Sequence, residues 1–397
     1  MLNTIGQNNP YLPPFTQDNN FVCPNFADEH AVAVAGIIHS QATLPPAFRG
    51  VSPGASLWCS GSCNGDLLQL EQSTNGAIGL GFRVINHSWG FDTGFTNLDP
   101  EDNFYDSRVF ADRRVLVFAA GNEGGPCRSM SGRVTSPAKG YNVITVGNFD
   151  DMNTQAWDDS IEQCSSFVDP FSSNHDRIKP EVCAPGRLIT TTLAFQQFGQ
   201  WFRDRFSNNS EITGTSFSAP HVTGEAALII GRAATTYGIT SFKRKPELIK
   251  AIILASANHD VEFGIDRDGL GGISASWADD VVTGFLGGWG DTSFVCTDPF
   301  PYTIATIPLQ VGLPTRIVIC WSTNPSYANY NLQPSSDLGF KLVDPLGNRV
   351  ATSNGFDNTF EWMDITPTIG GDYQIKILNR RCDMNPGLVA YAFWQNH

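Results

Sequence analysis

The segment EITGTSFSAPHVTGEAAL (residues 211–228) marks a change in the chain, from short polar and β-branched runs to a long helical pattern. Small and apolar residues continue from Thr215 to Tyr237, a length typical of a helix and too long for a strand. Pro220 falls close to the helix start, where a proline is tolerated. The Ser216 hydroxyl is therefore expected beside the free N–H groups and the positive end of the helix dipole.

A hydroxyl in this place has two interpretations. Thr215 or Ser216 could be an ordinary helix cap, which is the commoner use of Gly-Thr-Ser before a helix. Alternatively, Ser216 is a nucleophile, because the same N–H groups and dipole can stabilise an oxyanion. The rest of the chain decides between the two.

Short apolar strands alternate with helices on either side of this segment, from about residue 30 to residue 260. We expect strands in ASLWCSG (55–61), RVINHSWG (83–90), VLVFAAGN (115–122), NVITVGN (142–148) and RLITTTL (187–193). We expect further helices in DLLQLEQSTNGAIGLGF (66–82), NFYDSRVFADR (103–113) and KPELIKAIILASA (245–257). This alternation predicts an α/β fold, with a parallel sheet covered by helices on both faces.

The pattern changes after about residue 295. Short alternating strands, such as YTIATIPLQVG (302–312) and TRIVICWS (315–322), are separated by Pro, Gly, Asn and Asp, and no helix fits. This part is predicted to be a separate all-β sandwich, similar to a jelly roll. We place the two domains at residues 1–290 and 291–397.

Composition narrows the class of protein. The chain has 397 residues, of which 41% are hydrophobic and 11% aromatic, so a packed core is expected. The formal net charge of −14 disfavours nucleic acid and anionic membranes as partners. No apolar run reaches transmembrane length, and the first 15 residues lack the pattern of a signal peptide.

Nine cysteines are present, and none forms a C-x-x-C pair, so a zinc ribbon is not expected. Cys59 and Cys63 are close enough in sequence for a local disulfide. We expect a mixture of buried thiols and a few disulfides, and the odd count leaves at least one thiol unpaired within this chain.

Three other segments carry residues typical of a catalytic site. DEHAVAVAGII (28–38) places His30 at the start of a helix of small residues, VINHSWG (84–90) is an apolar strand that ends in Ser-Trp-Gly, and VLVFAAGNEGG (115–125) runs into a glycine turn with Asn122. Each has an ordinary explanation by itself, as a solvated helix start, a core tryptophan and a turn former. Together, and in this order, they favour the nucleophile interpretation of Ser216.

The motifs resemble those of the subtilases, a family of subtilisin-like serine endopeptidases. GTSFSAPHVTG resembles the family's nucleophile motif, HAVAVAG its histidine motif and AAGNEG its oxyanion-asparagine motif. The resemblance covers residues 28–290 and includes FSSNHDRIKPEVCAPG (171–186). It is strongest to bacterial alkaline subtilases with a C-terminal jelly-roll barrel, which share the long interval between histidine and serine, here 186 positions.

The resemblance implies a role for each catalytic residue. Ser216 Oγ would attack the scissile carbonyl, and His30 would take its proton and pass it to the leaving amine. The Asn122 side chain and the Ser216 N–H would stabilise the oxyanion.

The substrate-binding residues follow from the same resemblance. The substrate would pair in extended form along Ser88, Trp89 and Gly90. The backbone of Ala119, Ala120 and Gly121 would line the wall of the S1 pocket.

The resemblance also has implications beyond the catalytic residues. It implies a secreted monomer that acts on protein or peptide substrates, made with an N-terminal propeptide, with no cofactor for catalysis but with structural calcium. DRDGLGG (266–272) is somewhat like a calcium loop but lacks the spacing of an EF-hand, and a solvated turn fits it better. Asp337 lies in SSDLGFKLVDPLGN (335–348), a segment resembling one that can hold calcium, but Gly339 stands at one acidic position of that pattern. No metal ligands are assigned.

The chain departs from the family pattern at the acidic residue of the catalytic triad. In the family this Asp follows an apolar strand, and no apolar strand followed by Asp-x-Gly occurs before residue 30. We expect the first strand and its Asp to be missing, so that the chain is a shortened form of a longer subtilase. Asp18 and Asp28 are poor substitutes, so a catalytically impaired or inactive binding module remains the alternative.

Two smaller departures concern the motifs themselves. Ala31 replaces the usual glycine after the histidine, and Phe217 replaces the usual methionine after the nucleophile. The Ala31 methyl could crowd the substrate side. Phe217 is predicted to make the site resistant to peroxide, because a methionine can oxidise to a sulfoxide.

Overall fold

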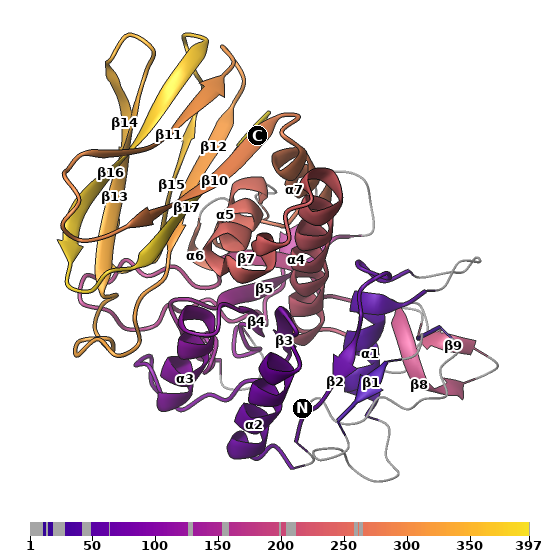
Figure 1. Cartoon of the computed structure of the whole chain (residues 1–397). Helices are drawn as coiled ribbons and strands as arrows, with labels where there is room; N and C mark the ends of the chain where they lie inside the picture. The colour runs from indigo at the N-terminus through magenta and orange to yellow at the C-terminus, as the bar shows by residue number, and fades with distance from the viewer. Residues whose placement is uncertain are drawn as a thin grey trace.

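The computed structural model describes most of the chain, as residues 11–12, 15–18, 28–41, 49–62, 64–125, 130–152, 159–197, 200–203, 212–257, 261 and 265–396. In these ranges, helices cover a parallel sheet in the first part, and two antiparallel sheets form the C-terminal part (Figure 1). Both parts agree with the predicted fold class. None of the described helices combines the length and the apolar character that crossing a bilayer requires.

The central sheet carries four parallel strands, which are β3 (Val84–His87), β4 (Val115–Ala119), β5 (Ile144–Asp150) and β7 (Val182–Pro185). The short β6 (Ser160–Ile161) pairs with β5 in the antiparallel direction. Every residue of β4 and β5 is buried. Because both faces of the sheet are covered, these strands consist of continuous runs of buried residues, without the alternation of a half-exposed strand.

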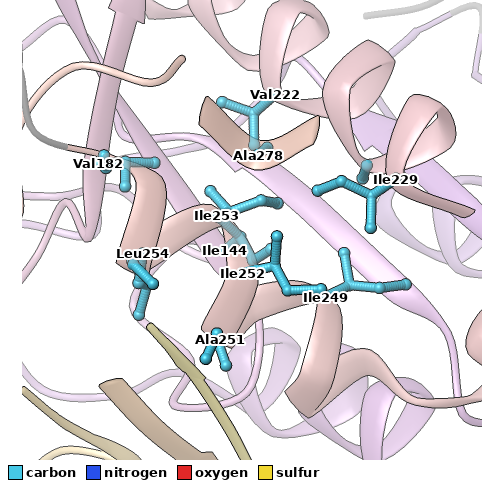
Figure 2. Close-up of a cluster of buried hydrophobic side chains, with 14 of the residues drawn as sticks. Ile144, Val182, Val222, Ile229, Ile249, Ala251, Ile252, Ile253, Leu254 and Ala278 are labelled. Atoms are coloured by element: carbon cyan, nitrogen blue, oxygen red, sulfur yellow. The ribbon is translucent and has the colours of Figure 1, made fainter. Parts of the chain in front are cut away.

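Among the described residues, the helices are α1 (Glu29–His39), α2 (Leu67–Gly79), α3 (Pro100–Phe110), α4 (Thr215–Tyr237), η1 (Ser241–Arg244), α5 (Pro246–Ser256), α6 (Ile265–Asp268) and α7 (Ala275–Thr283). Helices α3, α4 and α6 contact strands of the central sheet. Helix α4 contacts strands β3, β4, β5 and β7 and packs against α1, α5 and α7. Figure 2 shows Val222 and Ile229 of α4 beside Ile249, Ile252 and Ile253 of α5. The helix that begins with the predicted nucleophile therefore continues into the centre of the core.

A second, smaller sheet lies beside α1. Strand β1 (Thr16–Gln17) pairs in parallel with β2 (Trp58–Cys59), and neither strand pairs with β3 among the described residues. The structure thus has a strand before residue 30, where the sequence predicts none. Its two residues are polar, and backbone pairing with β2 rather than an apolar side-chain pattern forms it.

The β8–β9 hairpin (Thr191–Gln197 and Gln200–Arg203) packs on α1. The Thr191 and Thr192 hydroxyls donate to the backbone oxygens of Ala33 and Val32 at 2.7 and 3.0 Å. Gly36 allows this close approach, because a Cβ atom there would lie 2.2 Å from Oγ1 of Thr192. The hairpin therefore helps to set the position of the helix that carries His30.

The C-terminal part is a β-sandwich of two four-stranded antiparallel sheets. One sheet has the order β10 (Gly287–Phe294), β17 (Gly387–Gln395), β12 (Thr315–Trp321), β15 (Phe360–Ile365). The other has the order β11 (Tyr302–Leu309), β16 (Gly371–Cys382), β13 (Ser336–Val343), β14 (Arg349–Ser353). Buried side chains of both sheets form a common core, and a disulfide joins Cys296 to Cys382.

The described residues test part of the prediction that the cysteines are a mixture of thiols and disulfides. Cys164 is disulfide-bonded as well, and Cys320 is a buried thiol. Cys63 lies outside the described residues, so the predicted Cys59–Cys63 pairing is not described.

The sandwich and the α/β part share one hydrophobic core. Helix α5 packs on β12 and β17, so that Val318, Ala390 and Trp394 belong to the same buried cluster as α5 (Figure 1). Arg316 of β12 reaches into the α/β part, where it donates to the backbone oxygens of Ala257 and Leu270. The two parts are thus joined by a packed interface.

Candidate active site

One cavity of about 690 Å³ brings the three predicted catalytic residues together. Ser216 at the start of α4, His30 at the start of α1 and Asn122 after β4 all line it. The predicted substrate-binding residues that line the same cavity are Ser88, Trp89, Gly90, Ala119 and Gly121. Ala120 is fully buried and is not among the lining residues; its backbone N–H and oxygen bond to Val146 and Thr135.

The hydroxyl of Ser216 does not cap helix α4. The N-cap residue is Gly214, with a φ of 149° and no side-chain cap bond. Thr215 has the structural role here, because its Oγ1 accepts from the N–H of Gly121 at 3.1 Å. The Ser216 hydroxyl instead donates to the backbone oxygen of Ser88 at 3.3 Å, on the side of the cavity. This placement favours the nucleophile interpretation over the cap.

The side chain of Asn122 is oriented by Thr215. Its Oδ1 accepts from the Thr215 N–H at 3.0 Å and lies 3.2 Å from the Thr215 hydroxyl. Gly214 leaves room for this arrangement, since a Cβ there would lie 3.3 Å from the amide of Asn122. With the oxygen engaged, the Nδ2 hydrogens remain for another acceptor, as an oxyanion hole requires.

The imidazole of His30 packs against Phe217. Their ring centroids are 5.4 Å apart, and the planes are tilted by 56°. Phe217 is 9% exposed and belongs to an apolar cluster with Val34, Ile37 and Ile212. Phe217 therefore links helix α4, which carries Ser216, to helix α1, which carries His30.

Two carboxylates line the cavity, those of Asp28 and Glu123. Asp28 is the N-cap of α1, and its Oδ1 accepts from the Ala31 N–H at 3.1 Å. Asp18 follows β1, and its Oδ2 accepts from the Ser60 hydroxyl at 3.1 Å. Asp18 is not among the residues that line this cavity.

The substrate side of the cavity depends on close backbone approaches. Cβ atoms at Gly90 and Gly121 would lie 2.4 and 2.6 Å from Thr135. Gly121 also has a φ of 112°, which side chains other than glycine rarely allow. The Trp89 ring packs against Tyr105 and Phe118, so a tryptophan of the predicted substrate edge is also part of an aromatic cluster.

Behind this edge lies His87, whose Nδ1 accepts from the indole N–H of Trp89 at 3.1 Å. Its ring stacks on Phe118 with centroids 4.3 Å apart, and burial lowers its pKa to about 3. His87 is therefore neutral near pH 7, and it is not among the residues that line the cavity.

Sequence reasoning missed several lining residues. Leu67 and Leu70 of α2 face the cavity, and their spacing of three positions on one helix face was a signal that could have found them. Glu123 was visible next to Asn122, but only the fold shows that it lies at the cavity.

The described residues contain no group of three or more His, Cys, Asp or Glu side chains that could hold a metal ion. Asp337 is 5% exposed, and burial raises its pKa to about 7. In the 266–272 segment, Asp268 accepts from the Val261 N–H at 3.1 Å, and a Cβ at Gly269 would lie 2.3 Å from the Pro180 oxygen. The segment thus contains the end of α6 and a buried turn, and the prediction of a solvated turn is wrong, since Asp268 is 1% exposed.

Comparison with known proteins agrees with the motifs. The model of the Subtilase family, Peptidase_S8, matches residues 13–274. Subtilisin E of Bacillus subtilis (strain 168) is 31% identical over 211 residues, which are 52% of this chain and 46% of the relative. Subtilisin Savinase of Lederbergia lenta is 27% identical over 220 residues, 54% of this chain and 65% of the relative. The chain thus spans about half the length of the first of these curated relatives.

Solved structures agree on the fold. The S218A mutant of the protease domain of PatA superposes with a TM-score of 0.54 at 21% identity, over 72% of this chain and 94% of that one. The patellamide maturation protease PatA gives a TM-score of 0.53 at 22% identity, over 71% and 94%. At these identities the likeness concerns the fold alone.

Proposed function

The chain belongs to the subtilase family, and on that premise we propose that it is a serine endopeptidase that cleaves peptide bonds of proteins through an acyl-enzyme on Ser216. Serine peptidase activity is what membership implies at the level of the family. The observation that supports the finer proposal is the convergence of Ser216, His30 and Asn122 on one cavity.

In the proposed reaction, Ser216 Oγ attacks the scissile carbonyl while His30 takes the hydroxyl proton. The carbonyl oxygen becomes negative and accepts hydrogen bonds from Nδ2 of Asn122 and from the Ser216 N–H. The tetrahedral intermediate then expels the amine, which receives the proton from His30. Water hydrolyses the acyl-enzyme by the same steps in reverse order, and loss of the Asn122 donor would lower kcat by about 10²–10³.

The substrate would bind in extended form along Ser88–Gly90, the residues that follow β3 and line the cavity. The wall formed by Ala119 and Gly121 would receive the side chain before the scissile bond. Gly90 and Gly121 support this role, because side chains there would collide with Thr135 and close the approach.

The acidic partner of His30 is the open part of the proposal. Asp28 lines the cavity but caps α1, and Asp18 contacts Ser60. Loss of the acidic residue typically lowers kcat by about 10⁴ and leaves measurable catalysis. The alternative function, a catalytically impaired subtilase-like binding module, rests on this feature.

Labelling with a fluorophosphonate probe tests the proposal, because the probe reacts only with an activated serine. We expect an adduct in the wild type and none in Ser216→Ala. Ser218→Ala is the matched control, since Ser218 lies two positions further along α4 and is fully buried. If the wild type forms no Ser216-dependent adduct, the binding module is the better assignment.

We also propose that the protein is secreted, which the Cys296–Cys382 disulfide supports. A propeptide, a monomeric state and structural calcium belong to the same proposal and rest on family membership alone. For calcium, the expected result is a thermal midpoint that falls on addition of a chelator and returns with excess Ca²⁺. An unchanged midpoint would exclude a stabilising ion.

A further inference from the structure

We propose that Asn86 and Thr223 are positioning residues, which hold the Ser216 nucleophile in place through the side chain of Ser88. The inference rests on the proposed function, because positioning matters only if Ser216 reacts. Asn86 and Thr223 are not among the residues that line the cavity with Ser216 and His30. They act on Ser216 through a series of hydrogen bonds between α4 and β3.

The hydrogen bonds run in one direction, from Thr223 to Ser216. The Thr223 hydroxyl donates to Oδ1 of Asn86 at 2.9 Å, and Nδ2 of Asn86 donates to Oγ of Ser88 at 2.9 Å. The Ser88 hydroxyl then donates to the backbone oxygen of Ser216 at 2.6 Å. Because a hydroxyl has a single hydrogen, Ser88 must accept from Asn86, and this fixes the orientation of the Asn86 amide.

Pro220 explains why the Ser216 carbonyl accepts a hydrogen bond from a side chain. In an α-helix this carbonyl would accept from the N–H four positions further on, and that residue is Pro220, which has no N–H. Ser88, which is 2% exposed, supplies the missing donor. The backbone of Ser216, in the first turn of α4, is therefore bonded to the residue that directly follows β3.

Ser88 contacts Ser216 at a second point, but more weakly. The Ser216 hydroxyl donates to the Ser88 backbone oxygen at 3.3 Å, which is long for a hydroxyl bond. The short bond thus holds the backbone of the nucleophile, and the long bond leaves its hydroxyl able to turn toward a base. This division is what a positioned nucleophile requires.

Both residues are at least partly shielded from solvent. Thr223 is 6% exposed, and Asn86, a residue of β3, is half-buried; both line a separate cavity of about 150 Å³. Apart from Asn86, the Thr223 hydroxyl has only the Ala219 oxygen of its own helix within reach among the described residues, at 3.1 Å. Loss of the hydroxyl therefore leaves the Asn86 amide oxygen without its donor, and the amide becomes free to rotate away from Ser88.

The test compares kinact and KI for the fluorophosphonate probe in variants of the full chain. In Thr223→Val, which keeps the shape and removes the hydroxyl, kinact should fall about five-fold, the effect of one hydrogen bond, while KI stays unchanged. Thr223→Ser, which keeps the hydroxyl, should have the kinact of the wild type. Thr235→Val is the matched control, because the Thr235 hydroxyl bonds only to carbonyls of α4 on the exposed side.

A double-mutant cycle separates positioning from a general loss of structure. Ser88→Ala removes the last donor to the Ser216 carbonyl, so adding Thr223→Val to it should cause no further loss of kinact. Additive losses would contradict the proposal. Asn86→Asp should lower kinact to the same extent as Thr223→Val. Circular dichroism at the temperature of the assay should show that its fold is unchanged.

The outcomes distinguish this inference from the proposed function. A wild type that forms no adduct overturns both. A wild type that reacts, with kinact unchanged in Thr223→Val and Asn86→Asp, overturns the positioning role alone. If Thr223→Val does not fold, the comparison of Asn86→Asp with Ser88→Ala carries the same test.

Discussion

Phe217 directly follows Ser216, the proposed nucleophile, and contacts the His30 ring. The phenyl ring has no sulfur, so the site lacks the oxidisable group that a methionine would place there. We predict that labelling of Ser216 survives treatment with peroxide, while Phe217→Met becomes sensitive to the same treatment. Rapid inactivation of the wild type, with modification mapped next to Ser216, would refute the prediction.

Glu225 is a second residue of α4 with an unusual environment. It is 1% exposed, neither carboxyl oxygen has a hydrogen-bond partner among the described residues, and burial raises its pKa from 4.5 to about 8. The folded state holds the proton more tightly than the unfolded state, so stability is fully present below pH 4.5 and is lost as the pH rises toward 8.

Replacement of Glu225 tests that sign. Glu225→Gln should stabilise the protein at alkaline pH, by at most about 5 kcal/mol at about 1.4 kcal/mol per pKa unit. The difference between the two proteins should disappear at pH 4. Thermal midpoints of both, followed from pH 4 to 9, provide the measurement, and parallel curves would rule out an ionising Glu225.

The candidate catalytic residues could be predicted from the sequence because each lies near the end of a helix or strand. Ser216, His30 and Asn122 each begin a helix or follow a strand, and the order of the motifs shows that they belong together. The hydrogen bond between Thr223 and Asn86 joins residues 137 positions apart. It depends on the rotamers of two packed elements, and no local pattern encodes it.

At the scale of elements, the contact between α1 and the β8–β9 hairpin controls the position of His30. We predict that Gly36→Ala lowers the free energy of unfolding by about 1–3 kcal/mol, since the methyl would collide with Thr192. It should also slow labelling of Ser216 by the fluorophosphonate probe, because the displaced helix α1 would carry His30 away from its place in the cavity.

Gly231→Ala is the control for this helix glycine. Gly231 lies inside α4 with no atom near its missing Cβ, so the substitution should stabilise the protein by about 0.5–1 kcal/mol. Urea unfolding of both variants gives the two values. Equal effects of the two substitutions would mean that the hairpin does not restrict α1.

Elements with a strong internal pattern were predicted well. Helix α4 spans Thr215–Tyr237 as expected, because the run of small and apolar residues is too long for a strand and ends at Gly238, which caps the helix in the left-handed conformation. Strands β1, β6, β9, β10, β14 and β17 were not predicted. β10 contains three glycines in eight residues and β1 is polar, so neighbouring strands rather than their own side chains make them strands.

At the scale of the whole molecule, the stability of the active site should depend on the sandwich. Trp394 of β17 is 1% exposed, stacks on Trp277 of α7 at 4.5 Å and lies in the core that α5 shares. We predict that Trp394→Ala costs about 3–5 kcal/mol and abolishes Ser216 labelling at temperatures where the wild type still reacts.

Leu346→Ala is the control in the same part of the chain, since Leu346 is 71% exposed and its truncation should change stability by less than about 0.5 kcal/mol. Calorimetry should give a single transition for the wild type. Two separated transitions, or undiminished labelling in Trp394→Ala, would contradict a common core.

The two-part architecture was predicted from the change in pattern near residue 295, but the shared core was not. A sequence shows which side chains are apolar, and it does not show which partner covers them. The apolar run of α5, Pro246–Ser256, is buried along its entire length. Only the fold shows that part of that burial comes from β12 and β17.

Arg316 and the strands beside it have a consequence for hybrid proteins. A gene fusion that kept the α/β part and exchanged the sandwich for an unrelated domain would remove the strands that cover α5. It would also remove the Arg316 guanidinium that donates to the backbone oxygens of Ala257 and Leu270. A replacement domain would need strands whose side chains cover α5 as β12 and β17 do. We therefore expect related genes to keep the α/β part and the sandwich together, and substitutions in α5 to be accompanied by substitutions in β12 or β17.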